Sequence, residues 1–183
     1  MEGKDNNYLL VKKRKKDKIR LEKIGKNLLC YLVIMIFTVI LFHTIFLMVV
    51  IPSESMENTI KPGDIVFCTR YDQISRYDIV VIRMENGEYY IKRVIGMPGE
   101  TIEIRDGRVL ADGQELDDSF IKEPMDNSGD GIYRIPKGHY FMMGDNRNNS
   151  YDSRFWEEPY VSEDRIAGHP RIILFPLSET SIL

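Results

Sequence analysis

The feature that most limits how this chain folds is an apolar stretch of 24 residues, Leu28 to Ile51, which contains no Asp, Glu, Lys or Arg. An α-helix rises about 1.5 Å per residue, so a helix of this length crosses a hydrocarbon core of roughly 30 Å with some tilt. The stretch therefore predicts one transmembrane helix over residues 28–51.

The charges on either side of this stretch predict its orientation. Residues 1–27 hold ten Lys or Arg against four Asp or Glu, whereas residues 52–183 hold 15 basic and 24 acidic side chains. Lys and Arg accumulate on the cytoplasmic flank of membrane spans. We therefore expect a single-pass protein of the cytoplasmic membrane, with a basic cytoplasmic segment over 1–27 and an extracytoplasmic domain over 52–183. The basic segment could also bind anionic lipid head groups.

The exit from the apolar stretch indicates an anchor that is not removed. The apolar region of a cleaved signal is usually about 7 to 15 residues long and ends in small residues. This stretch is longer and runs into Ile51-Pro52. Cys30 lies inside the stretch and Cys68 beyond it, so no disulfide is expected within one chain. A lone His43 in the span is assigned no chemistry.

After Pro52 the pattern changes to short alternating segments separated by turn residues, which indicates strands. Asn86-Gly87 favours a tight hairpin turn in which both central residues have positive φ. The polar segment 117–131 shows neither period, so we expect a surface loop or a small flap. The predicted fold class is mostly β, an antiparallel barrel or sandwich preceded by one transmembrane helix. The six expected strands are 64–71, 78–84, 89–95, 101–105, 140–143 and 165–175.

Ser55 is the candidate nucleophile, because it follows the membrane exit by a few residues in the segment PSESM at 52–56. A serine hydroxyl needs a base, and the usual base is histidine. The two histidines after the span, His139 and His169, stand in no recognisable triad motif or metal-ligand spacing. A lysine can replace histidine if burial lowers its pKa toward neutrality.

Lys92 is the candidate base. It opens the segment KRVIGMPG at 92–99, and the period of two puts Tyr90, Lys92 and Val94 on one face of an expected strand. If this face points inward, an aromatic and a β-branched side chain desolvate the amine. The alternative is a solvated face on which Lys92 only forms an ion pair.

A third polar segment, GDNRNNSYDSR at 144–154, follows an apolar strand. The three segments, in this order after one apolar anchor, resemble the bacterial type I signal peptidases, which are Ser/Lys proteases. The closing stretch 165–177 also resembles that family's C-terminal strand. About 50 residues separate the second and third segments, as in the compact members common in Gram-positive bacteria. Asn58 and Glu100 stand where proline and aspartate are common in the family.

The resemblance implies a role for each matching residue. Ser55 is implied to be the nucleophile and Lys92 the general base. The hydroxyl of Ser53 and the backbone N–H of Ser55 are implied to form the oxyanion hole. Ser150 is implied to hydrogen-bond and orient the Lys92 amine. The implied supporting ion pairs are Asp145 with Arg93 and Asp152 with Arg154.

The same resemblance implies the substrates and partners. The substrates would be the signal peptides of exported preproteins, cleaved at the outer membrane surface after small residues such as alanine at positions -1 and -3. The other partners would be membrane lipid and, transiently, the export machinery. No cofactor and no metal site is suggested by the sequence. Residues 1–27 are too short for a DNA-binding head, so no nucleic acid is expected as a partner.

Two other functions fit the same residues. One is a different membrane-anchored Ser/Lys peptidase, such as a pilin-processing enzyme. The other is a non-catalytic anchored β module that binds export components, with its serines and lysine serving only structure. Release of a mature product from a preprotein distinguishes a peptidase from a binding module.

Overall fold

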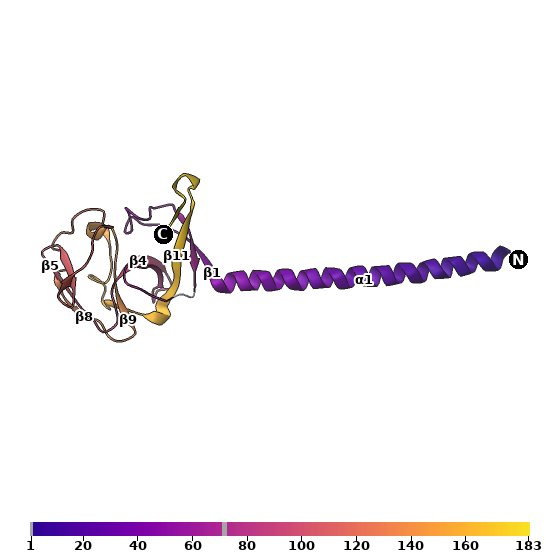
Figure 1. Cartoon of the computed structure of the whole chain (residues 1–183), viewed down its shortest axis with the longest axis horizontal. Coiled ribbons are helices and arrows are strands. Elements are labelled where there is room, and N and C mark those ends of the chain that lie inside the picture. The colour runs from indigo at the N-terminus through magenta and orange to yellow at the C-terminus, as the bar shows by residue number, and fades with distance from the viewer. Residues whose placement is uncertain (1, 71–72) are drawn as a thin grey trace. The chain divides into compact units, whose positions relative to one another are not determined.

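The computed structural model describes residues 2–70 and 73–183, which form two compact units, one ending at Thr44 and the other covering Ile45–Leu183. The first unit consists of the long helix α1, Glu2–Ile45, without its last residue (Figure 1). Within it, Arg20–Ile45 is long and apolar enough to cross a membrane, with a mean hydropathy of 2.5 and no burial inside the protein. In lipid such a helix satisfies its own backbone hydrogen bonds, which accounts for the helical form of the apolar stretch.

Helix α1 ends before the apolar stretch does. Residues Phe46–Val50 form strand β1, which pairs antiparallel with β2, Ile65–Thr69. The Ile51 side chain is 3% exposed and belongs to the core of the second unit. The expected span of 28–51 therefore divides at Ile45, because apolar and β-branched residues suit a buried sheet as well as lipid.

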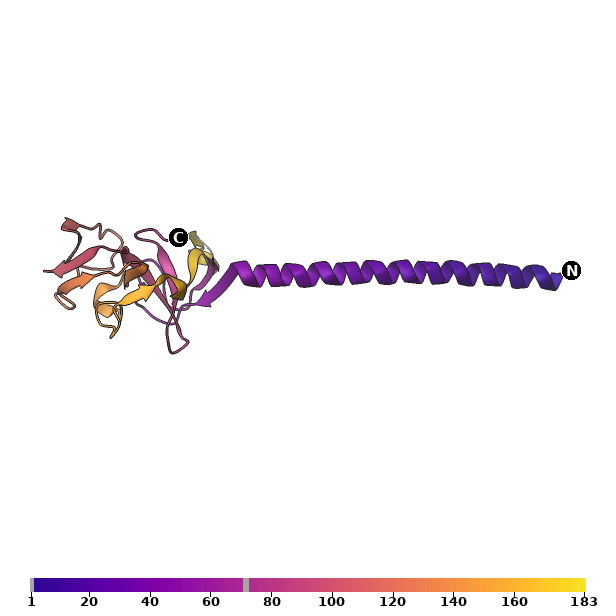
Figure 2. The ribbon, with the colours of Figure 1, turned by 90° about the horizontal axis from the view of Figure 1, so that it is seen from below.

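The second unit is built from antiparallel strands, which confirms the predicted fold class. The larger sheet has the order β1-β2-β11-β3-β4-β9-β10, with β12 paired to β11, and the smaller sheet has the order β7-β6-β5-β8. Figure 2 shows the larger sheet curled beside the smaller one. The other strands are β3 (Ile79–Arg83), β4 (Tyr89–Gly96), β5 (Thr101–Arg105), β6 (Arg108–Ala111), β7 (Gln114–Glu115), β8 (Gly131–Arg134), β9 (His139–Met143), β10 (Tyr160–Ser162), β11 (Ile166–Phe175) and β12 (Ser181–Ile182). Three short 3-10 helices lie at Arg147–Asn149, Glu163–Arg165 and Leu177–Glu179.

The six expected strands correspond to β2, β3, β4, β5, β9 and β11, with ends that coincide or differ by at most two residues. Tyr71, the last residue of the first expected strand, lies outside the described residues. The expected hairpin joins β3 to β4, but through a longer turn than predicted. Gly87 has φ 84°, whereas Asn86 is not in the positive-φ region, and its side chain accepts a hydrogen bond from the Glu88 N–H at 3.0 Å.

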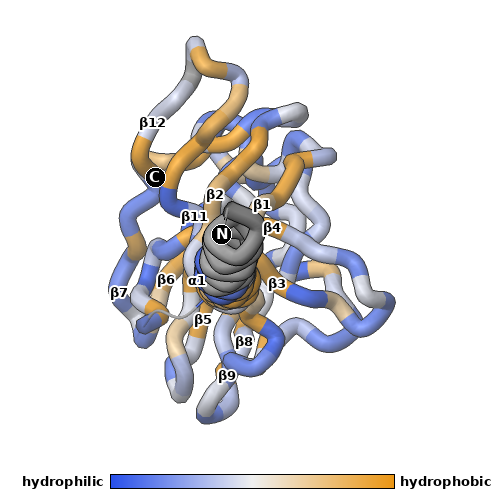
Figure 3. The backbone as a smooth tube through the Cα atoms, turned by 90° about the vertical axis from the view of Figure 1, so that its right-hand side faces the viewer, coloured by the Kyte–Doolittle hydropathy of each residue, from blue (hydrophilic) through white to orange (hydrophobic). Residues whose placement is uncertain are grey.

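Strand β4 runs through the centre of the larger sheet and carries the candidate base. Tyr90 and Val94 pack in one buried cluster, whereas Ile91 belongs to another on the opposite face. The alternation expected for this strand is therefore present, and it leaves Lys92 between two apolar neighbours. Figure 3 shows that strands β1, β2 and β11 consist largely of hydrophobic residues.

Candidate active site

The nucleophile candidate lies on a tight turn that follows β1. The N–H groups of Thr59 and Ile60 both donate to the Met56 carbonyl, and the Glu57 N–H donates to the Glu54 carbonyl at 2.9 Å. Met56 and Ile60 are 1% and 0% exposed, so they anchor the turn in the core. Ser55 is 8% exposed on the other side of this anchored turn.

The amine of Lys92 meets the hydroxyl of Ser55, two groups 37 residues apart in the sequence. Lys92 is 4% exposed, and its Nζ donates to Ser55 Oγ at 2.7 Å. Burial lowers the pKa of Lys92 to about 8, and nearby Asp152 opposes this shift while Arg154 adds to it. An amine that is neutral in part near pH 8 can accept a proton through this same contact.

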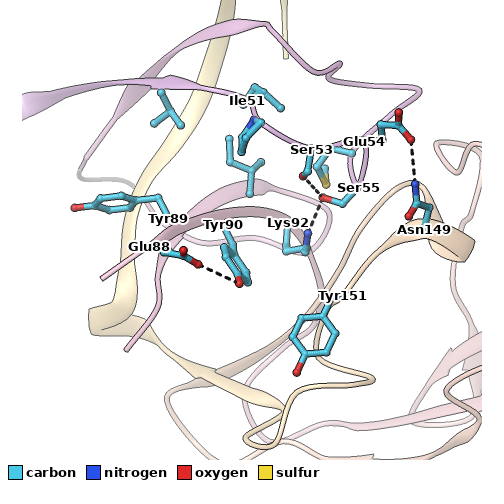
Figure 4. Close-up of a pocket in the computed structure, with 14 residues that line it drawn as sticks. Ile51, Ser53, Glu54, Ser55, Glu88, Tyr89, Tyr90, Lys92, Asn149 and Tyr151 are labelled. Carbon is cyan, nitrogen blue, oxygen red and sulfur yellow. Dashed lines mark hydrogen bonds between the residues drawn. The ribbon is translucent and has the colours of Figure 1, made fainter. Parts of the chain in front are cut away.

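Ser55 and Lys92 line a groove with a volume of about 810 Å³. Val49 and Ile51 from the β1 side and Ile91 from β4 give it apolar walls. Ser53 lines the groove as well, and its Oγ lies 3.2 Å from Ser55 Oγ. In Figure 4 the side chains of Ser53 and Lys92 converge on Ser55. This arrangement suits an extended peptide whose carbonyl reaches Ser55 beside the hydroxyl of Ser53 and the amine of Lys92.

The structure contains both expected ion pairs. Arg93 Nε donates to Asp145 Oδ1 at 2.7 Å, and Arg154 Nε donates to Asp152 Oδ1 at 2.8 Å. Both aspartates are fully buried. Asp152 also accepts the Gly144 N–H at 3.0 Å. The pairs therefore tie the polar segment 144–154 to itself and to the strand that carries Lys92.

Ser150 does not make the hydrogen bond that was expected of it. Its Oγ is buried and, among the residues described, has no hydrogen-bond partner, so the expected bond to the Lys92 amine is not formed. The reason is that Lys92 Nζ is directed at Ser55, while Ser150 Oγ packs against Gly144. A Cβ built on Gly144 would lie 2.3 Å from Ser150 Oγ and 2.4 Å from the Ser55 carbonyl. Glycine is thus required for this close approach.

Two residues that the sequence did not single out hold the nucleophile turn. Asn146 is 2% exposed, its N–H donates to the Ser55 carbonyl at 3.1 Å and its Nδ2 donates to the Glu54 carbonyl at 3.1 Å. Thr59 Oγ1 donates to Asp145. Asn146 lies inside the segment 144–154 and Thr59 lies shortly after the segment 52–56, but their partners are 86 to 92 residues away in sequence. The spacing of residues along the sequence therefore cannot predict such contacts.

Known proteins are similar to this chain in sequence. A family model described as signal peptidase, peptidase S26, matches residues 24–175. A signal peptidase I from Leptolyngbya laminosa is 38% identical over 141 residues, covering 70% of this chain and 68% of that protein. Signal peptidase I T from Bacillus subtilis (strain 168) is 34% identical over 151 residues, covering 75% and 78%. The crystal structure of a signal peptidase I from Enterococcus faecalis V583 covers 54% of this chain and 97% of its own, at 29% identity and a TM-score of 0.47.

Proposed function

Because the chain belongs to the signal peptidase family, peptidase S26, we propose that it cleaves signal peptides from exported preproteins with Ser55 as nucleophile and Lys92 as general base. The observation that carries this proposal is the 2.7 Å contact between a buried lysine amine and a serine hydroxyl at the floor of an apolar groove. Burial that lowers the pKa of Lys92 to about 8 supports the role of the amine as a base.

The proposed reaction follows from this geometry. Ser55 Oγ attacks the scissile carbonyl while its proton passes to Lys92 Nζ, and the new oxyanion accepts hydrogen bonds from Ser53 Oγ and the Ser55 N–H. Lys92 then gives the proton to the leaving amine, which is the N-terminus of the mature protein. A water molecule then gives a proton to the neutral Lys92 and attacks the acyl-Ser55 ester. Lys92 passes this proton to Ser55 Oγ as the ester bond breaks and the signal peptide is released.

The direct test is incubation of the purified full-length protein with a preprotein in detergent or lipid vesicles. We expect two products, the mature protein and the signal peptide, with the new N-terminus identified by mass spectrometry. A non-catalytic β module would bind the preprotein and release neither product. Cleavage at sites other than the end of the signal sequence would instead favour a different membrane-anchored Ser/Lys peptidase.

The proposed topology places residues 1–27 in the cytoplasm, the apolar part of α1 in the membrane and the β unit outside. The ten basic residues ahead of the apolar stretch support this orientation. In intact right-side-out vesicles, added protease should digest the β unit and leave the segment before Leu28 protected, as detected with an N-terminal tag. Inside-out vesicles supply the control, because they should show the reverse. Protection of the β unit in right-side-out vesicles would contradict the outside location.

A further inference from the structure

The segment Asp117–Asp126, called here the strap, belongs to the stretch 117–131 for which the sequence predicts a surface loop or a small flap, and it contacts all three catalytic segments. It reaches the nucleophile turn, the strand that carries Lys92 and the polar segment 144–154. Its backbone forms part of these contacts, so they do not depend on long side chains alone. The contacts are Asn58 Nδ2 to the Phe120 carbonyl at 3.2 Å, the Lys122 N–H to the Asp145 carbonyl at 3.0 Å, Asn148 Nδ2 to the Pro124 carbonyl at 3.1 Å and the Asp126 N–H to Asn148 Oδ1 at 2.9 Å.

Phe120 is the centre of the strap. The Arg93 guanidinium carbon lies 4.4 Å from the centroid of its ring, and that of Arg147 lies 5.6 Å away. The Tyr77 ring packs on the same side chain with a centroid distance of 5.6 Å. An aromatic ring attracts a guanidinium over its face and shields it from water. The ring therefore covers the ion pair between Arg93 and Asp145.

This ion pair connects the strand that carries Lys92 with the residues that hold the turn of Ser55. Arg93 is the neighbour of Lys92 on β4, and Asp145 is the neighbour of Asn146, whose N–H holds the Ser55 carbonyl at 3.1 Å. Asp145 also accepts a hydrogen bond from Thr59 on the nucleophile turn. The pair thus sets the distance between the strand of the base and the turn of the nucleophile.

The turn that carries Ser55 also contacts the strap directly, through Asn58. Asn58 has φ 99°, a conformation that asparagine tolerates better than most residues, and its side chain donates to the Phe120 carbonyl. The second link, between Lys122 Nζ and Glu57 at 2.6 Å, is partly exposed. Exposed ion pairs contribute little because water screens them. The Asn58 contact is exposed as well, so the ring of Phe120 against Arg93 is the link that matters most.

We propose that Phe120 is a positioning residue, whose ring covers the Arg93–Asp145 pair and thereby holds Lys92 Nζ within reach of Ser55 Oγ. This inference rests on the proposed function of the Ser55–Lys92 pair. Phe120 touches neither the groove nor the dyad. Its loss should reduce the rate of chemistry more than the binding of substrate, since small displacements of reacting groups reduce rates strongly.

The test compares three substitutions of Phe120 in the full-length protein with a preprotein substrate. Active enzyme is counted by stoichiometric labelling of the nucleophile with an acylating inhibitor, and kcat is expressed per labelled site. Phe120→Ala should lower kcat about 10-fold and change KM less than about twofold. Phe120→Leu keeps apolar volume without the aromatic face and should lower kcat about fivefold. Phe120→Tyr keeps the face and should restore kcat to within about twofold of wild type.

Tyr133→Ala is the matched control, because it also truncates an aromatic side chain of the same core cluster. The Tyr133 ring packs on Phe141 at 4.6 Å, and its hydroxyl donates to the Gly129 carbonyl. This variant should lower the thermal unfolding temperature and leave kcat per labelled site unchanged. The proposal is overturned if Phe120→Ala, or Phe120→Leu where the alanine variant does not fold, keeps wild-type kcat per site. Failure of Phe120→Tyr to restore the rate also overturns it. The proposed function is tested separately, by the release of mature protein from a preprotein by the wild-type enzyme and the loss of that release in Ser55→Ala.

Discussion

Replacement of Ser55 by alanine is expected to reduce the release of mature protein from a preprotein by about 10⁴-fold or more. The alanine side chain has no oxygen to form the acyl-enzyme ester, so both steps of the proposed reaction lose their covalent intermediate. In serine proteases, loss of the nucleophile removes nearly all catalysis beyond that from binding and the oxyanion hole. Product release is measured by gel electrophoresis and mass spectrometry over several hours.

The structure indicates that the alanine variant will fold. The Ser55 hydroxyl accepts one hydrogen bond from Lys92 and makes one weaker contact with Ser53, whereas Met56 and Ile60 anchor the turn. Loss of one hydrogen bond costs about 1 kcal/mol of the free energy of unfolding. Ser75→Ala, at an exposed serine, is the matched control and should keep wild-type activity. A folded Ser55→Ala protein that still releases mature product would exclude Ser55 as nucleophile.

Local patterns in the sequence were sufficient to predict the parts of this structure that depend on one element at a time. The period of two around Lys92 correctly predicted that Tyr90 and Val94 share a buried cluster, because a strand alternates its faces regardless of its partners. Turn residues separated the strands for a similar reason. The positions of Ser55 and Lys92 followed from motifs, and their contact at 2.7 Å agrees with the roles that the resemblance implied.

Features that depend on two distant segments could not be predicted in this way. The helix ends at Ile45 because β2 offers hydrogen bonds to residues 46–50, and the apolar composition of that stretch does not distinguish lipid from a sheet. The Ser150 hydroxyl lies against Gly144 rather than on Lys92, a detail set by packing. The strap looked like an unpatterned polar loop, since its contacts with Arg93 and Asn58 lie outside any local period.

Replacement of Lys92 by arginine is expected to reduce kcat by about 10³-fold to 10⁴-fold, the upper range for loss of a general base. Arginine keeps the positive charge and the hydrogen-bond donors, but it stays protonated at any accessible pH and cannot take the Ser55 proton. If Lys92 only formed a structural contact, the arginine variant would keep much of its activity. Lys137→Arg, at an exposed lysine, is the matched control. Circular dichroism and thermal unfolding establish that the bulkier side chain at position 92 has not displaced β4.

The pH dependence of the wild-type enzyme gives an independent measure of the same base. Burial lowers the pKa of Lys92 from 10.5 to about 8, so the amine is about half neutral near pH 8. Only the neutral amine accepts a proton, so kcat/KM should level off above about pH 9 and fall about tenfold for each pH unit well below 8. An unperturbed lysine, with a pKa of about 10.4, would place this fall in kcat/KM more than two pH units higher. Any residual activity of Lys92→Arg should not show this fall in kcat/KM below pH 8. A wild-type kcat/KM that stays constant from pH 9 down to pH 6 would show that no group with the lowered pKa of Lys92 acts as the base.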